Sequence, residues 1–129
     1  MADPFQDVDA AGDAFISAFA DSMDERQSDP TMEKIVSEYL GKLEFAQDSL
    51  TVEVGCGAGA VTRRIAERAN PERVIGFEPS VGFVKEAKER VSDCDNVEFD
   101  VAGGASLPID DGVVDVLIMH TVLTHVKEP

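Results

Sequence analysis

Apolar residues change their spacing partway along the chain, and the change separates a helical part from a part that alternates strands and helices. After an acidic tail over residues 1–8, apolar side chains recur at helical spacing over 9–23 and again over 29–43. The second helix has a clear start, because Asp29 is a typical N-cap and Pro30 a typical first helical residue. We therefore expect a mobile tail followed by two amphipathic helices.

Short, nearly continuous apolar runs begin after residue 46 and predict strands. The predicted strands cover 50–54, 73–77, 97–101 and 113–119, and the amphipathic stretches between them predict helices over 59–69 and 80–91. Apolar strands in alternation with helices are typical of a parallel sheet. We expect an α/β, Rossmann-like, mostly parallel sheet with helices on both faces, preceded by N-terminal helices.

A turn with three alternating glycines follows the first predicted strand. The sequence there is Thr51-Val52-Glu53-Val54-Gly55-Cys56-Gly57-Ala58-Gly59-Ala60. Glycine adopts positive φ readily and lets a ligand approach the backbone, and the helix that follows offers unpaired N–H groups to a polar or anionic group. Cys56 fits such a turn as a small side chain. The pattern predicts a nucleotide-like cofactor held by Gly55, Cys56, Gly57 and Gly59.

Two acidic residues flank the turn and bear on the identity of the cofactor. Glu78 closes the second predicted strand about 20 residues after the glycines, where a carboxylate can accept hydrogen bonds from both hydroxyls of a ribose. The glycines also fit the dinucleotide pattern G-x-G-x-x-G/A, so an NAD(P)-binding oxidoreductase is one interpretation. Glu53 favours another, because a carboxylate just before the first glycine suits a cofactor with a cationic end, such as S-adenosylmethionine.

Four segments, in order, resemble the motifs of class I S-adenosylmethionine-dependent methyltransferases of the small-molecule type. They are Val52–Gly59 around the glycines, Val74–Ser80 around the acid, Leu107–Leu117 leading into the fourth strand, and Val122–Pro129 after it. The resemblance implies S-adenosylmethionine as cofactor and S-adenosylhomocysteine as product, with Glu78 and Pro79 on the ribose side and Glu53 favouring the amino group. It divides the chain into an N-terminal tail and helical cover, 1–45, and the cofactor-binding half of a methyltransferase domain, 46–129.

Two features depart from the family pattern. Where the family has an acid that meets the adenine amino group, this chain has Gly103 and Gly104, so we expect a backbone contact from Gly104 or a contribution from nearby Asp100. The sequence also stops near the start of the helix after the fourth strand, so we expect the later strands of the family fold to be absent, as in a C-terminally truncated fragment. The apolar fourth strand would then be an open edge, which predicts self-association through it.

A histidine after the fourth predicted strand is the candidate for catalysis. His120 would lie on the substrate side of the sheet, where it could contact the cofactor and act as a general base. A histidine that only caps the strand end fits the position as well, and for His125 we expect a structural role. Four residues of the first helix could form a lid over the site or belong to the core: Phe15, Phe19, Met23 and Arg26.

Composition excludes several classes of function. The net charge of −15 over 129 residues disfavours a nucleic-acid partner, whose phosphates need a basic face, and also fits a salt-adapted organism. The sequence has no apolar run near the ~20 residues of a membrane span, so we expect a cytoplasmic protein without a membrane partner. The two cysteines lack metal-type spacing, and we expect no metal.

We therefore predict S-adenosylmethionine-dependent methyl transfer to a small-molecule acceptor. Two alternatives stay open on the sequence: an NAD(P)-binding oxidoreductase, and an inactive cofactor-binding fragment or pseudoenzyme.

Overall fold

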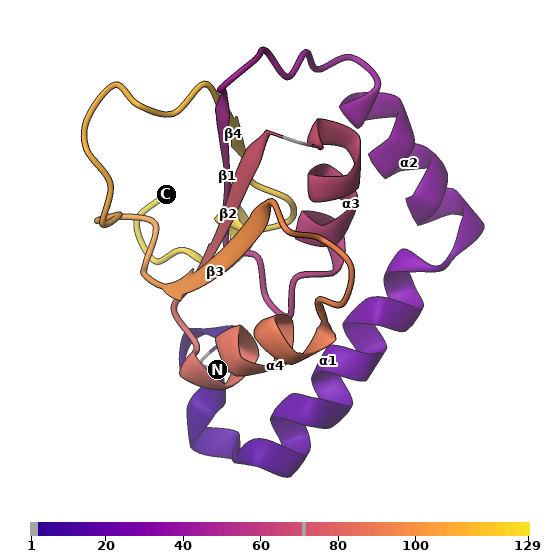
Figure 1. Ribbon diagram of the computed structural model, residues 1–129. Coiled ribbons are helices and arrows are strands. Elements are labelled where there is room, and N and C mark those ends of the chain that lie inside the picture. Colours follow the sequence, from indigo (N-terminus) through magenta and orange to yellow (C-terminus); the bar gives the residue numbers. More distant parts are fainter. Residues whose placement is uncertain (1–2, 71) are drawn as a thin grey trace.

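Four parallel strands in the order β3-β2-β1-β4 form the centre of the fold. The computed structural model describes residues 3–70 and 72–129 (Figure 1). The strands are β1 (Leu50–Val54), β2 (Arg73–Glu78), β3 (Val97–Val101) and β4 (Val116–Ile118). The α-helices are α1 (Asp13–Gln27), α2 (Pro30–Leu40), α3 (Ala60–Ala69) and α4 (Val81–Arg90), and short 3-10 helices cover Pro4–Gln6, Val8–Ala11 and Leu123–His125. The expected Rossmann-like α/β fold with N-terminal helices is confirmed.

Parallel pairing brings the carboxyl ends of the strands to one edge of the sheet. In β1, Glu53 pairs with Gly76 of β2 on one side and with Ile118 of β4 on the other. The glycine turn follows β1 directly, and Glu78 is the last residue of β2. Open parallel sheets bind their ligands at this edge. The topology therefore places the predicted cofactor residues of β1 and β2 next to each other.

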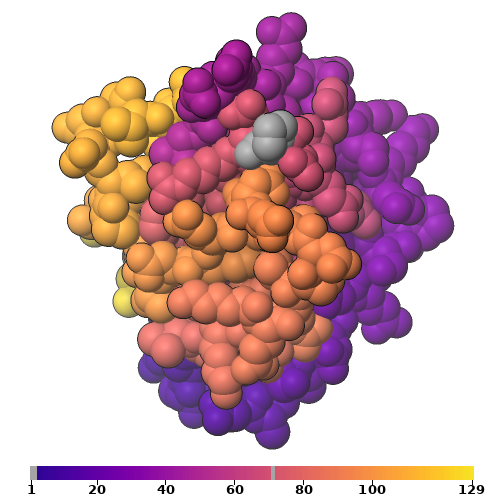
Figure 2. Space-filling model, in the orientation of Figure 1, coloured from indigo at the N-terminus to yellow at the C-terminus, as the bar shows by residue number. Residues whose placement is uncertain are grey.

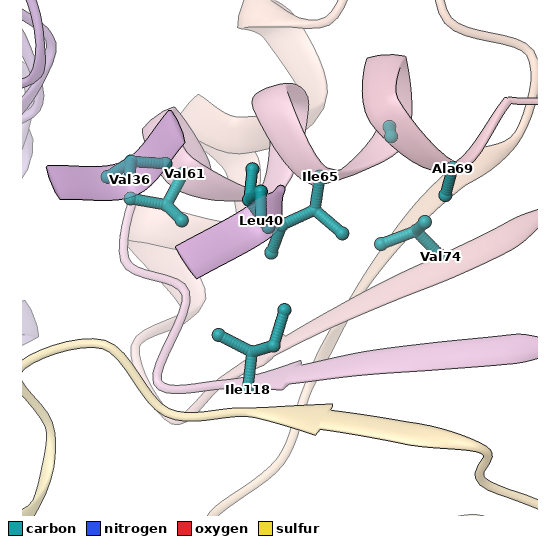
Figure 3. Close-up of a cluster of buried hydrophobic side chains, with 8 residues drawn as sticks. Val36, Leu40, Val61, Ile65, Ala69, Val74 and Ile118 are labelled. Carbon is teal, nitrogen blue, oxygen red and sulfur yellow. The ribbon is translucent and has the colours of Figure 1, made fainter. Parts of the chain in front are cut away.

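The helices lie on one face of the sheet, which differs from the expectation of helices on both faces. Side chains of α2 and α3 form a buried cluster with Val74 and Ile118 (Figure 3), and α4 packs against Phe99. In the described part of the chain the opposite face is covered by residues 102–114, whose side chains Leu107, Ile109 and Val114 pack on Val52, Val54, Ile75 and Phe77. This covering segment contains three glycines, two aspartates and one proline, which favour turns over helix. Figure 2 shows the segment after β3 standing out from one side of the molecule.

The first helix is longer than its apolar pattern predicts, because charged side chains extend it. Asp24 accepts hydrogen bonds from Arg63 of α3 and from Arg90 of α4, and Arg90 also contacts Asp21 at 2.8 Å. These ion pairs are partly shielded from solvent, since Arg63 and Arg90 are only 22% and 20% exposed. They fasten α1 across the other two helices, so the polar stretch that ends at Gln27 stays helical.

The N-terminal tail is ordered from residue 3 on, in contrast to the expectation of a mobile tail. Val8 is 5% exposed and packs in a cluster with Ile16 and Phe83, and the ring of Phe5 stacks edge-on against Phe19 with centroids 5.1 Å apart. Residues 1 and 2 lie outside the described residues. The apolar residues of this short segment are sufficient to dock it on α1 and α4.

β4 forms one edge of the sheet, and its exposed apolar side chains predict self-association. Leu117 and Met119 are 54% and 44% exposed. An unprotected apolar edge strand pairs readily with another chain. We expect the wild-type chain to have a mass above 13.9 kDa in size-exclusion chromatography with light scattering, and Leu117→Lys to lower the oligomeric fraction. A wild-type monomer across the concentration range would contradict this prediction.

Candidate cofactor and active site

The glycine turn is fixed to β2 and needs its glycines. All three glycines have positive φ, between 54° and 82°. The amides of Gly55 and Cys56 donate to the carbonyl of Phe77 at 2.8 and 3.1 Å. A Cβ atom at Gly55 would come within 2.6 Å of the Val122 side chain. Both the backbone conformation and the available space therefore exclude larger residues.

Two further side chains lie at the turn: Cys56 within it, and Met23 of α1 over it. Cys56 is 8% exposed, and burial raises the pKa of its thiol well above the ordinary value, so the thiol stays neutral. Met23 of α1 lies over the turn, with its sulfur 3.1 Å from the position of a Cβ at Gly57. Cys56 thus fills space, and Met23 is placed where a lid residue would be.

Glu53 points into the protein beneath α3. It is 2% exposed, and its Oε1 accepts a hydrogen bond from Thr62 Oγ1 at 2.5 Å. Burial raises the pKa of Glu53 from 4.5 to about 7, although the bond from Thr62 lowers it. The side chain is therefore shielded from solvent. A cation at the turn would be attracted by the ionised carboxyl only through the intervening protein, where the low dielectric strengthens the interaction.

Glu78 lies at the carboxyl edge, beside the glycine turn. Its Oε2 accepts a hydrogen bond from the Ser80 amide at 2.8 Å, which fixes the orientation of the carboxylate. Burial raises its pKa, whereas the amides of Ser80 and Gly57 lower it. Pro79, which follows, is exposed. Glu53 and Glu78 thus flank the turn as predicted, with Glu53 internal and Glu78 at the edge.

Asp9 connects the N-terminal segment to this acid. Its Oδ1 accepts hydrogen bonds from Ser80 Oγ at 2.5 Å and from the Gly82 amide at 3.1 Å, and its Oδ2 accepts from the Val81 amide at 2.8 Å. Burial raises the pKa of Asp9, but these hydrogen bonds outweigh it and the pKa is lowered. A carboxylate here satisfies orphan amides of α4 and faces the positive end of its dipole.

Replacing Asp9 by alanine should destabilise the fold. Loss of a helix cap costs about 1 kcal/mol, which corresponds to a fall of roughly 4 °C in the melting temperature of a chain this size. Asp7→Ala is the matched control, because Asp7 is exposed and its side chain makes no cap hydrogen bond. Equal melting curves for the two variants would mean that the Asp9 contacts do not stabilise the protein.

His120 lies beside the glycine turn and contacts Tyr39 of α2. Ile118 pairs with Glu53, and the Val122 side chain lies against Gly55, so His120, between them in the sequence, lies near the start of the glycine turn. The Tyr39 hydroxyl oxygen is 3.3 Å from His120 Nδ1. Burial and the charge of Arg26 lower the pKa of His120, and burial and Glu53 raise the pKa of Tyr39 to about 12. Both side chains are therefore neutral near pH 7.

Of the residues expected near adenine, Gly103 and Gly104 lie in the exposed segment after β3, and Asp100 lies within β3. At Gly103 an added Cβ would meet nothing within 4 Å, whereas at Gly104 it would lie 3.0 Å from Val54. The Asp100 carboxylate accepts a hydrogen bond from the Val101 amide at 2.8 Å. Gly103 therefore has room for a larger side chain, and Asp100 is engaged with the backbone of its own strand.

His125 joins the two ends of the described chain. Its Nδ1 lies 2.6 Å from Asp3 Oδ2, and its ring packs on Phe5 with centroids 4.6 Å apart. This is the structural role expected for it. Within the described ranges, no group of three or more His, Cys, Asp or Glu side chains could hold a metal ion, and no helix is long and apolar enough to cross a membrane.

Three residues at this edge were missed by sequence reasoning: Asp9, Thr62 and Tyr39. Asp9 and Tyr39 reach the site from elements far away in the sequence, so no local motif indicates them. Thr62 could have been found from the sequence, because it is the one hydroxyl residue in the first turn of the helix after the glycines. In the structure it lies on the side of the buried Glu53.

Comparison with known proteins places the chain among methyltransferases. Residues 51–129 match the family model described as a methyltransferase domain. An uncharacterised 37.1 kDa transposon protein of Streptomyces fradiae is 28% identical over 92% of this chain and 36% of its own length. Trans-aconitate 2-methyltransferase of Paracidovorax citrulli is 32% identical over 55% of this chain and 27% of its own length.

Solved structures show the same fold. A SAM-dependent methyltransferase of Aquifex aeolicus superposes with a TM-score of 0.63 at 21% identity, over 76% of this chain and 55% of that one. Human N-acetylserotonin methyltransferase in complex with SAM gives a TM-score of 0.71 at 18% identity, over 95% of this chain and 33% of that one. The chain spans about a third of the length of the first curated relatives, 36% for those of Streptomyces fradiae and Schizosaccharomyces pombe. The family match covers more than half of the chain, and the fold agrees with it: the chain belongs to the methyltransferase-domain family, as a class I S-adenosylmethionine-dependent methyltransferase domain.

Proposed function

We propose that this domain binds S-adenosylmethionine at the carboxyl edge of β1 and β2 and serves methyl transfer to a small-molecule acceptor. The observation that carries the proposal is the position of the Glu78 carboxylate beside the glycine turn, oriented by the Ser80 amide. Two ribose hydroxyls need an acceptor of this kind, and the turn offers backbone without side chains beside it. The residues present therefore suit the cofactor of the family.

Each part of the proposed site has a separate task. Glu78 accepts hydrogen bonds from the ribose, with Pro79 next to it, and Gly55, Cys56, Gly57 and Gly59 pass close to the amino-acid part. Glu53 favours the cationic end through its field, and Gly103 and Gly104 lie on the adenine side. The bound cofactor supplies a methyl group on a positively charged sulfur, which is already activated. The protein then has mainly to align the acceptor and exclude water.

Thermal shift with two ligands separates this function from the alternatives. We expect S-adenosylhomocysteine to raise the melting temperature and NADH to leave it unchanged, because a ligand that binds only the folded state stabilises it. Stabilisation by NADH alone would favour an NAD(P)-dependent oxidoreductase. Stabilisation by S-adenosylhomocysteine without release of product from S-adenosylmethionine, over a panel of small acceptors, would favour the inactive binding module.

The acceptor is proposed to be a small molecule. The net charge of −15 opposes a polyanionic acceptor. Among the relatives, three are named for trans-aconitate and one for phosphoethanolamine, both small molecules. Methylation of nucleic acid in preference to small acceptors, measured by release of S-adenosylhomocysteine, would contradict this part of the proposal.

Restoring an acid at Gly103 should tighten cofactor binding. The exposed backbone has room for the side chain, and an aspartate there could accept a hydrogen bond from the adenine amino group. A hydrogen bond to a charged acceptor contributes about 1.5 kcal/mol, or roughly tenfold in affinity. We expect Gly103→Asp to bind S-adenosylhomocysteine about tenfold more tightly, and Gly103→Ala, which lacks an acceptor, to bind as the wild type does. Equal affinities for all three proteins would place adenine elsewhere.

A further inference from the structure

His120 and Tyr39 form a hydrogen-bonded pair that the proposed function leaves unexplained. The pair joins α2 to the segment after β4, with 3.3 Å between the Tyr39 hydroxyl oxygen and His120 Nδ1 and the two rings inclined at 34°. The second ring nitrogen, Nε2, is buried and has no hydrogen-bond partner among residues 3–70 and 72–129. One side of the imidazole is thus satisfied from within the protein, and the other is not.

The chemistry of the pair determines where the imidazole proton lies. The phenol keeps its proton, because burial and the nearby Glu53 disfavour its ionised form. A phenol donates well, and the free lone pair of a neutral imidazole is a strong acceptor. If Tyr39 donates to Nδ1, the ring proton of His120 lies on Nε2.

We propose that Tyr39 holds His120 as the Nε2–H tautomer, so that His120 donates a hydrogen bond to the amino-acid carboxylate of the bound cofactor and does not act as a general base. Tyr39 is a positioning residue in this arrangement. The inference rests on the proposed function for the identity of the ligand, but the tautomer itself does not depend on it.

The surroundings of Nε2 suit a carboxylate. His120 lies between Ile118, which pairs with Glu53, and Val122, whose side chain lies against Gly55 of the turn, and Arg26 is close enough to lower the pKa of His120. Arg26 is one turn further along α1 than Met23, which covers Gly57. An amino-acid group needs a negative field for its ammonium and donors for its carboxylate. Glu53 supplies the first, and His120 beside Arg26 supplies the second.

The orphaned donor also explains why a ligand would be favoured here. A buried N–H without a partner is unfavourable, and an acceptor oxygen on a ligand would remove that cost. A general base would instead need its free lone pair directed at the substrate. In this arrangement the one lone pair of the ring, on Nδ1, accepts the hydrogen bond from Tyr39 and is not directed at a substrate. Under this proposal His120 is a hydrogen-bond donor and not the general base for which its position in the sequence also made it a candidate.

The tautomer can be measured directly, because the chain contains only two histidines and one tyrosine. We expect long-range ¹⁵N–¹H spectra of the full chain at pH 7.5 to show His120 protonated on Nε2, with the Nδ1 resonance shifted by its hydrogen bond. Tyr39→Phe should move that Nδ1 resonance toward the value of a free acceptor and leave His125 unchanged. A proton on Nδ1, or a His120 spectrum insensitive to Tyr39→Phe, would overturn the proposal.

Binding variants then test the donor role. We expect His120→Ala to weaken S-adenosylhomocysteine binding by about tenfold, and His120→Gln, whose amide keeps a donor, to stay within about threefold of the wild type. Neither variant should change the affinity for 5′-deoxy-5′-methylthioadenosine, which lacks the amino-acid group. If the wild type binds S-adenosylhomocysteine and His120→Ala binds it equally well, the donor role is wrong. If the wild type does not bind it, the proposed function fails instead.

Discussion

Glu78→Gln should weaken S-adenosylhomocysteine binding by about 100-fold. In the structure the Glu78 carboxylate is oriented by the Ser80 amide, so its charge and lone pairs face the carboxyl edge. Hydrogen bonds to an ionised acceptor contribute about 1.5–3 kcal/mol, and a loss of about 2.7 kcal/mol corresponds to 100-fold. Glutamine keeps the shape of the side chain but removes the charge, and it turns one acceptor into a donor. The affinity is measured by calorimetric titration at pH 8.

Glu89→Gln is the matched control for this variant. It makes the same chemical change on the adjacent helix α4, at an exposed side chain. We expect it to bind S-adenosylhomocysteine as the wild type does and to melt at the same temperature. If Glu78→Gln kept the affinity of this control, the ribose would have to be bound by other residues.

Glu53→Gln should change the pH dependence of stability. The pKa of Glu53 is about 7 in the folded protein against 4.5 when exposed, so the folded state holds its proton more tightly than the unfolded state. Stability therefore falls as pH rises from about 4.5 through about 7, since the unfolded chain has already released the proton. The difference between the two pKa values corresponds to ~3 kcal/mol at pH 8 and to almost nothing at pH 4.

The measurement is the free energy of unfolding in urea as a function of pH. We expect Glu53→Gln to be more stable than the wild type at pH 8 by about 3 kcal/mol and nearly equal at pH 4, because glutamine has no proton to lose and can still accept the hydrogen bond from Thr62. Glu89→Gln again serves as control, with no such pH-dependent gain. Parallel curves for Glu53→Gln and the wild type would mean that Glu53 is not held in a desolvated site.

Local sequence predicted the centre of this fold well, because its strands and turn carry their own signals. The β-branched run over β1 and the glycines after it determine a strand, a turn of positive φ and a helix start. Glu78 ends β2 and lies beside the turn, because the carboxyl ends of neighbouring parallel strands meet at one edge of the sheet. These features depend on residues close together in the sequence.

The remaining features of the fold, such as the lengths of α1 and β4, depend on contacts between residues that are distant in the sequence. α1 continues to Gln27 only because Asp24 meets Arg63 and Arg90, and no apolar periodicity shows this. The fourth strand shortens to Val116–Ile118, since β4 pairs only with Thr51–Glu53, before the backbone of β1 turns at the glycines.

The candidate site shows the same division. Its acids and glycines were found from spacing, and Gly103 was found from a family pattern. The neighbours that set the behaviour of those residues come from far along the chain: Asp9 is 73 residues from Gly82, and Tyr39 is 81 from His120. The buried state of Glu53 also could not be read from a strand that alternates polar and apolar residues, because α3 covers its polar side as well.

Isothermal titration calorimetry with S-adenosylhomocysteine tests the central claim most directly. The full chain, shown to be folded by circular dichroism, should give a saturable one-site isotherm with S-adenosylhomocysteine, no heat with NADH, and a much weaker isotherm for Glu78→Gln. Saturable binding of NADH, or the absence of binding of S-adenosylhomocysteine to the folded chain, would contradict the account.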